Sequence, residues 1–418
     1  MTLVLRMSAA VLNFALGILL SRALGVHDFG QYSVSLAVVN SAVVIALLGH
    51  DSLANREIST SSTPRSYLRK ASSSVWWVSA GVVLAATWFL GFSHWIDALQ
   101  MPMLLLVTTI PLVARIRLAE GVIRGVHRSN MAQVPDGLVR PLMAVLLMLM
   151  LMAATDSASD QVGIIGILIG TTIVALALLL RVERRSIDSA GPDNMQASDD
   201  VGNFSPMLYL SALLSAATNQ APVIAAGLFA GAAVAGQYAA IEKIALAASM
   251  IQQITYLSMS SHIALRHAKG QTRGMERAVI RKTRSTTVLT LGACIVLGTF
   301  AESILGLYGS SFATHGTSLA WLLLLPLVNA AAGPVGPLLT MTRHEKDYFL
   351  SMLASVLVQG IAYVLLVPRY ALDGVVASAI VGSLTWNGMM ACMVWRRLGI
   401  IPFFILRALP HESDDENA

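Results

Sequence analysis

Apolar runs of about twenty residues recur along the whole chain and constrain its fold more than any other feature. A helix of that length crosses the ~30 Å hydrocarbon core of a membrane and pairs its own backbone groups. We therefore predict an all-α polytopic membrane protein of about twelve transmembrane helices. The predicted spans are residues 7–24, 33–53, 73–95, 101–119, 137–155, 162–180, 205–230, 238–261, 285–308, 318–341, 349–368 and 374–395.

The composition supports this class and excludes a soluble globular domain. The chain is 56% hydrophobic and only 12% charged, whereas charged residues make up about a quarter of a soluble domain. The sequence does not show the alternating ten-residue segments of a transmembrane barrel. Cys294 and Cys392 both fall inside predicted helices, so we predict no disulfide framework.

The basic residues predict the orientation. With an even number of spans both termini lie on one side, and 25 of the 28 Lys and Arg residues lie in connections or helix ends on that side. Cytoplasmic connections carry this excess, so both termini are predicted to be cytoplasmic. The exceptions are Arg22 and Arg369 on the outer side and Lys243 within a span. The net charge of +5 is then explained by anionic lipid at the inner surface and needs no nucleic acid.

The connections also predict the domain organisation. All outer loops are short, and the longest inner connection is polar and contains Gly and Pro, as expected of a flexible linker. We predict a six-helix lobe over 1–185, a cytoplasmic linker over 186–204 and a second six-helix lobe over 205–396. Residues 397–418 are predicted to form an interfacial segment and an acidic tail.

A repeated motif indicates that the two lobes are related. LGVHDFGQYSVS at 24–35 and AGAAVAGQYAAI at 230–241 both read G-x-x-x-x-G-Q-Y, 206 residues apart, and the same offset places Asn13 on Asn219. A six-helix unit has an even number of spans, so the lobes are parallel repeats about an axis along the membrane normal. The motif lacks the Lys and Ser or Thr of a phosphate-binding loop. Its glycines instead predict tight turns between helices 1 and 2 and between helices 7 and 8.

The first copy of the motif also carries a family resemblance. SRALGVHDFGQYS (21–33) followed by DSLANREIS (51–59), together with GQYAAIEKIALA (236–247), resembles the polysaccharide flippases of the multidrug/oligosaccharidyl-lipid/polysaccharide (MOP) superfamily. The resemblance implies two lobes around a central cleft. It also implies a transporter that flips a polyprenyl-pyrophosphate-linked oligosaccharide, an O-antigen, capsule or exopolysaccharide unit, to the outer leaflet of the bacterial inner membrane by alternating access. Polysaccharide polymerase machinery is the implied partner.

A pyrophosphate-sugar head group needs cations for phosphate and amides or hydroxyls for sugar. Intramembrane residues of these types are the natural candidates, because hydrocarbon tolerates them poorly. The predicted translocation cleft comprises Asn13, Arg22, Arg56, Arg117, Asn219 and Lys243. Each has a structural alternative: Lys243 snorkels outward, the arginines anchor at head groups, and Asn13 and Asn219 belong to stripes of small residues that pack helices closely.

Three acidic residues are candidates for coupling or gating: Asp51, Glu57 and Glu242. Glu242 lies about 100° around its helix from Lys243, so the two side chains face different directions. The coupling ion is a proton or sodium, and no resident cofactor is predicted. The nine histidines are scattered without H-x-x-x-H or H-E-x-x-H spacing, so no metal site is predicted.

Two other function classes remain open at this point. A membrane polysaccharide polymerase would need catalytic groups on substantial outer loops, and the outer acids stand on short ones: Asp28, Asp97, Asp156, Asp160 and Asp373. A small-molecule or cation antiporter of the same superfamily would place a buried acidic site inside one lobe. The leading hypothesis is therefore a flippase that is not an enzyme.

Overall fold

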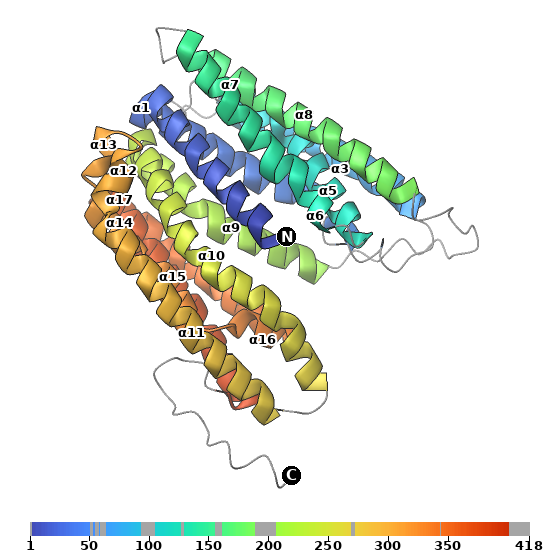
Figure 1. The fold of residues 1–418 in the computed structure, drawn as a ribbon, viewed down its shortest axis with the longest axis vertical. Coiled ribbons are helices and arrows are strands. Elements are labelled where there is room, and N and C mark those ends of the chain that lie inside the picture. Colours follow the sequence, from blue (N-terminus) through green and yellow to red (C-terminus); the bar gives the residue numbers. More distant parts are fainter. Residues whose placement is uncertain are drawn as a thin grey trace. The chain divides into compact units, whose positions relative to one another are not determined.

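The computed structural model describes residues 2–50, 53–54, 58, 64–92, 105–126, 129–154, 161–188, 206–268, 272–342 and 344–400. Within these ranges every regular element is a helix and no strand is formed (Figure 1). The predicted all-α class is therefore confirmed.

The chain divides into two compact units, Met1–Gly236 and Gln237–Ala418. The helices of the first unit are α1 (Thr2–Leu47), α3 (Pro64–Phe92), η1 (Leu105–Thr109), α5 (Ile110–Gly125), α6 (Ser129–Val134), η2 (Pro135–Val139), α7 (Arg140–Ala154), α8 (Gln161–Asp188) and α9 (Pro206–Ala230). Those that follow are α10 (Ala232–Ala268), α11 (Thr272–Thr299), α12 (Ala301–Gly306), α13 (Ser310–Ala313), α14 (Gly316–Leu322), α15 (Leu324–Ala332), α16 (Val335–Met341) and α17 (Glu345–Leu398).

These helices correspond to the twelve predicted spans. Five of them are long and apolar enough to cross a membrane, and the bent pair α14–α15 with α16 makes a sixth. Both α1 and α17 contain one non-helical residue, Gly25 and Ala371 respectively, so each consists of two helical segments that match two predicted spans. The four remaining predicted spans coincide with α3, η1–α5, α10 and α11.

The bends after helices 1 and 7 lie at the first glycine of each motif copy. Gly25 has φ 76° inside α1, and Gly231 has φ 91° between α9 and α10. Such positive φ angles cost glycine little, because it has no Cβ to clash with the backbone. The prediction that these glycines permit tight turns is confirmed.

The predicted boundary between the lobes, 186–204, lies mostly outside the described residues. Division by contacts instead separates Gly236 from Gln237 and places α9 in the first unit. The reason is that α9 packs along α1 within that unit (Figure 1).

Each unit has its own core: in the first, Ile116, Ile123, Ala175 and Leu179 join α5 to α8.

In the second unit the core joins α10, α11, α16 and α17 around Met259, Val279, Leu338 and Met390. Large apolar side chains such as Trp77 on α3 and Leu357 on α17 are exposed. In a protein that spans a membrane these side chains face lipid, which accepts apolar surface without cost.

Candidate functional site

The two amides related by the repeat occupy similar environments. Asn13 on α1 and Asn219 on α9 are both exposed, and the Asn13 side chain donates a hydrogen bond to the carbonyl of Ala9 at 2.8 Å, one turn back. The stripe of small residues on α1 continues one and two turns further along with Gly17 and Ser21, which are both buried. The Ser21 hydroxyl donates to the carbonyl of Ile18 at 2.9 Å. The stripe therefore packs at Gly17 and Ser21, and only its amide end is open to other contacts.

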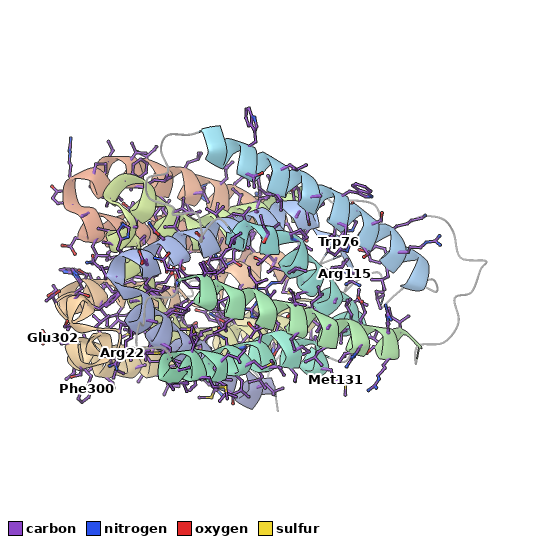
Figure 2. The ribbon with its side chains drawn as sticks, turned by 90° about the horizontal axis from the view of Figure 1, so that it is seen from above. Arg22, Trp76, Arg115, Met131, Phe300 and Glu302 are labelled. Atoms are coloured by element: carbon purple, nitrogen blue, oxygen red, sulfur yellow. The ribbon has the colours of Figure 1, made fainter. Side chains whose placement is uncertain are left out.

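The two described cleft arginines, Arg22 and Arg117, stand on different helices, α1 and α5. Figure 2 shows Arg22 toward one end and Arg115 toward the other, and Arg22 is exposed on α1. Arg117 on α5 is half-exposed, with its guanidinium 3.7 Å from the carboxylate of Glu120. Three further candidates, Asp51, Arg56 and Glu57, lie outside the described residues.

A buried ion pair stands beside Arg117 and was not predicted. Arg115 on α5 donates to both carboxylate oxygens of Glu183 on α8, at 3.2 and 2.5 Å. Both side chains are buried, and the fork of the guanidinium matches the carboxylate in a bidentate pair. This pair fixes the ends of α5 and α8 to each other. Next to it, Glu120 accepts from Arg124 at 2.7 Å, one turn along α5.

The second unpredicted pair lies within a membrane-crossing helix. The segments α6, η2 and α7 are continuous, and the middle one, Pro135–Val139, is a π-helix. Asp136 in this π turn pairs with Arg140 at 2.9 Å. The π geometry is rare and often marks functional positions.

Arg140 is deep in the span. A further 14 helical residues follow it before α7 ends at Ala154, a length of about 21 Å. It also lies within electrostatic range of the buried hydroxyl of Tyr32, which is about 10 Å along its helix from the bend at Gly25. The count of inner-side basic residues includes Arg140, and its side in the membrane stays a prediction. Its side chain is 32% exposed, so it remains open to another partner.

In the second unit Glu242 and Lys243 are neighbours on α10, and both are half-buried. Glu242 lies within electrostatic range of the hydroxyls of Tyr238, one turn back, and of Tyr363 on α17. The Tyr363 hydroxyl accepts a hydrogen bond from the Gln359 amide at 3.0 Å. Glu242 therefore stands at the edge of a polar cluster between α10 and α17, where a carboxylate can gain or lose a proton or bind a cation.

A second polar network in this unit carries no charge. The side-chain oxygen of Asn329 on α15 accepts from Ser383 at 3.1 Å and from Asn387 at 2.6 Å, both on α17. The Tyr256 hydroxyl on α10 donates to the backbone carbonyl of Asn329 at 2.7 Å. Sequence reasoning missed this network. The signal for it was the Gly333-Pro334 pair, which breaks the helix and leaves the last carbonyls of α15 without helical donors.

The outer acids in the described residues make structural hydrogen bonds. Asp28 accepts from the amide of Gln161 at 2.5 Å, and Asp373 accepts from the hydroxyl of Ser318 at 2.7 Å. Beside Asp373, partial burial lowers the pKa of His315, and the nearby carboxylate opposes that shift. Neither acid is paired with a second carboxylate as general acid–base catalysis on a sugar requires. Asp97, Asp156 and Asp160 lie outside the described residues.

Metal chemistry finds no support in the described part of the chain, where no group of three His, Cys, Asp or Glu side chains converges. The chemistry available there is instead ionic and hydrogen-bonding. It consists of arginine and carboxylate pairs in the first unit. In the second unit it consists of amides, hydroxyls, Glu242 with Lys243, and the ion pair of Asp347 with Arg397 at 2.8 Å.

Comparison with known proteins agrees with the fold and with the resemblance seen in the sequence. The family described as "Polysaccharide biosynthesis protein" matches residues 1–261. No curated protein sequence matches the chain. Three similar solved structures cover 94–95% of this chain.

These three structures all belong to transport proteins. The lipid II flippase MurJ in an inward closed conformation has a TM-score of 0.72 at 11% identity, with 86% of its chain covered. An inward-facing multidrug resistance MATE family transporter of the MOP superfamily has a TM-score of 0.69 at 12% identity, with 98% covered. A MOP superfamily transporter from Pyrococcus furiosus has a TM-score of 0.62 at 11% identity, with 93% covered. The chain therefore has the two-lobe fold of this superfamily.

Proposed function

Because this chain belongs to the polysaccharide biosynthesis protein family, we propose that it flips a polyprenyl-pyrophosphate-linked oligosaccharide from the inner to the outer leaflet. It does so by alternating access, with two six-helix lobes, 1–185 and 205–396, as the moving parts. The membrane is the bacterial inner membrane, and both termini are cytoplasmic. No covalent chemistry is required, and polysaccharide polymerase machinery uses the product.

The observation that carries this proposal is Arg140, an arginine in the middle of a membrane-crossing helix. Hydrocarbon tolerates such a group poorly, so its position calls for a functional reason. The carboxylate of Asp136 pairs with its guanidinium at 2.9 Å. Two oxygens of a phosphate group can accept from a guanidinium in a bidentate manner, as a carboxylate does, and a pyrophosphate carries more negative charge. It can therefore replace Asp136 on the guanidinium.

The other cleft residues complete the proposed path. Arg22, Arg56, Arg117 and Lys243 supply further positive charge, and Asn13 and Asn219 supply amides for sugar hydroxyls. Glu242 is the proposed coupling group, with Asp51 and Glu57 as gating candidates, and a proton or sodium drives the cycle. In support, Glu242 lies within electrostatic range of two buried tyrosine hydroxyls, Tyr238 on α10 and Tyr363 on α17.

The first test is to follow lipid-linked intermediates in cells from which the gene is deleted, in a background where the initiating sugar transferase can be switched off. We expect a complete polyprenyl-pyrophosphate oligosaccharide to accumulate on the inner leaflet. Normal arrival at the outer leaflet would exclude the flippase, and unpolymerised lipid there would favour the polymerase alternative.

Complementation then tests Arg140 itself. Replacing Arg140 with Ala removes a charge-assisted hydrogen bond of about 1.5–3 kcal/mol, so transport should fall by roughly 10- to 100-fold. Arg140→Lys keeps the charge and loses the bidentate geometry, so it should retain part of the activity. Arg184→Ala is the control, because Arg184 is exposed on α8 and is not one of the proposed cleft residues. Full transport by the Arg140→Ala variant would remove Arg140 from the path.

One observation favours a second candidate, the small-molecule antiporter. The half-buried Glu242 beside Tyr238 and Tyr363 is the kind of acidic site that such an antiporter needs inside one lobe. Drug efflux from cells that express the chain distinguishes the two functions. Glu242→Gln should abolish efflux if the antiporter is correct, whereas Arg140→Ala should leave efflux unchanged.

A further inference from the structure

The third helix of each repeat carries the same local pattern near its start. Residues 69–77 on α3 read RKASSSVWW, and residues 281–289 on α11 read RKTRSTTVL. Each stretch places an adjacent Arg and Lys seven positions before two apolar residues. The two stretches are 212 residues apart, six more than the copies of the G-x-x-x-x-G-Q-Y motif. The repeat therefore extends to a second pattern, which we call the Arg-Lys pair and its apolar partners.

The two helices also have matching surroundings, each within its own unit. At equivalent positions, Val75 on α3 and Thr287 on α11 are buried. Further along, Thr87 and Thr299 each donate a hydrogen bond to the carbonyl four residues back, at 2.9 and 2.8 Å. The side chains of both Arg-Lys pairs are exposed. The two helices therefore bury the same side and present the same side outward.

On α11 the exposed side changes from cationic to apolar within two helical turns. Seven residues advance a helix by about 10.5 Å and return nearly to the same side. Val288 and Leu289 therefore lie on the side of the Arg-Lys pair that they follow, and Leu289 is 61% exposed. A further two turns along, Val296 is exposed as well. The cations thus stand at one end of an apolar surface that faces lipid.

The corresponding side of α3 has the same layout with aromatic residues. Trp76 and Trp77 follow the Arg-Lys pair at the seven-residue spacing, and Trp77 is 78% exposed. Leu84, seven residues after Trp77, is exposed too. Tryptophan favours the level where acyl chains meet head groups. The Arg-Lys pair, about 10.5 Å closer to the start of the helix, then lies among the head groups.

Few acids oppose these cations within the two helices. The sequence of α3 contains no Asp or Glu, and that of α11 contains only Glu276. Glu276 lies about 120–140° around the helix from Arg281 and Lys282. Arg284 is instead a neighbour of Arg281 on the same side, three residues along, and adds a third cation. In the predicted orientation this positive charge meets the cytoplasmic leaflet, where anionic lipids gather.

We propose that each unit binds one anionic phospholipid of the cytoplasmic leaflet, with the phosphate on the Arg-Lys pair and the acyl chains along its apolar partners. Guanidinium and ammonium groups donate to phosphate oxygens, and the apolar side chains accept acyl chains without cost. The occupant is a leaflet lipid, because both surfaces face lipid and neither contains a proposed cleft residue. This inference does not depend on the proposed flippase function.

Counting bound lipids tests the proposal. In native mass spectrometry the purified protein should retain two molecules of phosphatidylglycerol, and phosphatidylcholine should not replace them. Arg281→Gln with Lys282→Gln should remove one molecule, because the loss of two cations weakens its binding roughly 30-fold. Arg69→Gln with Lys70→Gln should remove the other. Unchanged retention in either double variant would overturn the proposal.

Another basic pair separates a defined site from general attraction to positive charge. Arg184 and Arg185 are adjacent and exposed at the end of α8. The positions seven residues before them hold only Ala177 and the half-buried Leu178, so this pair has no large exposed apolar partners. Arg184→Gln with Arg185→Gln should therefore retain both phosphatidylglycerol molecules. An equal loss in this control variant would show that any basic pair binds the lipid, and the proposal would be wrong.

Competition identifies the occupant. Millimolar inorganic phosphate should leave both lipids bound, because it has no acyl chains, and Leu289→Ser with Val296→Ser should weaken retention in the second unit several-fold. Unchanged retention by the serine variant, or displacement of phosphatidylglycerol by inorganic phosphate or by an equal concentration of a polyprenyl phosphate, would contradict the proposal. Every readout is binding, so these results stand whether or not the deletion test supports the flippase.

Discussion

The two units place different kinds of polar group in their interiors. The first contains charged pairs that join or stiffen helices, Arg115 with Glu183 and Asp136 with Arg140. The second contains the uncharged network of Asn329, Ser383 and Asn387. Its ion pair of Asp347 with Arg397 has an exposed guanidinium. The two repeats therefore share the order of their helices but differ in the polar groups of their interiors.

The difference follows from which backbone groups in each interior need a side-chain partner. In the second unit the helix breaks at Gly333, which has φ 74°. The carbonyls of Asn329 and Ala330 then accept side-chain donors, from Tyr256 at 2.7 Å and from Thr287 at 3.0 Å. Neutral donors are sufficient for this task. The charged pairs of the first unit are not needed for this task, and under the proposed function Arg140 would bind an anionic head group.

The largest effect should come from removing one partner of the buried ion pair. Glu183→Ala leaves Arg115 charged and uncompensated, which costs about 3–5 kcal/mol. The midpoint of thermal unfolding in detergent should fall clearly. Replacing both Arg115 and Glu183 with Leu removes the stranded charge, so the double variant should be more stable than Glu183→Ala. A single variant as stable as the unsubstituted protein would show that the pair adds nothing to the first unit.

A smaller effect should come from the neutral network. Asn329→Ala leaves the donors of Ser383 and Asn387 without their acceptor. Hydrogen bonds between membrane helices average about 0.6 kcal/mol, so the loss should be about 1–2 kcal/mol in unfolding free energy. Thr385→Val is the control, because Thr385 donates to Val381 on its own helix. If Asn329→Ala costs as much as Glu183→Ala, the contrast between charged and neutral interiors has no energetic basis.

Much of the fold could be predicted because the membrane imposes it. A chain in hydrocarbon must pair its backbone within helices, so apolar length alone predicted the spans. The bends at Gly25 and Gly231 could be predicted because the motif is repeated and glycine marks turns. Each of these inferences depends on local sequence, which one chain displays in full.

The site was less predictable because its pairs are distant in sequence or depend on geometry. Glu183 lies 68 residues from Arg115, and no local pattern links them. Pro135, Asp136 and Gly137 are residue types typical of a turn, yet in the structure they continue the helix through a π turn. The helical path through Arg140 and its pairing with Asp136 were therefore missed. The close approach of α1 to α10 also needed coordinates, since the motif predicts turns but no contact: a Cβ added to Gly30 would lie 2.9 Å from the nitrogen of Gly236.

The smallest change in stability should come from the two amides related by the repeat. Asn13 and Asn219 are both exposed, and Asn13 donates to the carbonyl of Ala9 within its own helix. Replacing either with Ala should change unfolding free energy by no more than about 0.5 kcal/mol. If the amides contact sugar, transport should nevertheless fall several-fold in both variants, and by a similar factor because the repeat places them equivalently.

The paired measurement separates a functional role from packing. Loss of transport at unchanged stability in both variants would place Asn13 and Asn219 in the cleft. Loss in one variant alone would mean that the two repeats contact the substrate unequally, as their different interiors suggest. Unchanged transport in both would assign the amides to the lipid-facing surface and leave the charged groups of the first unit to bind the head group.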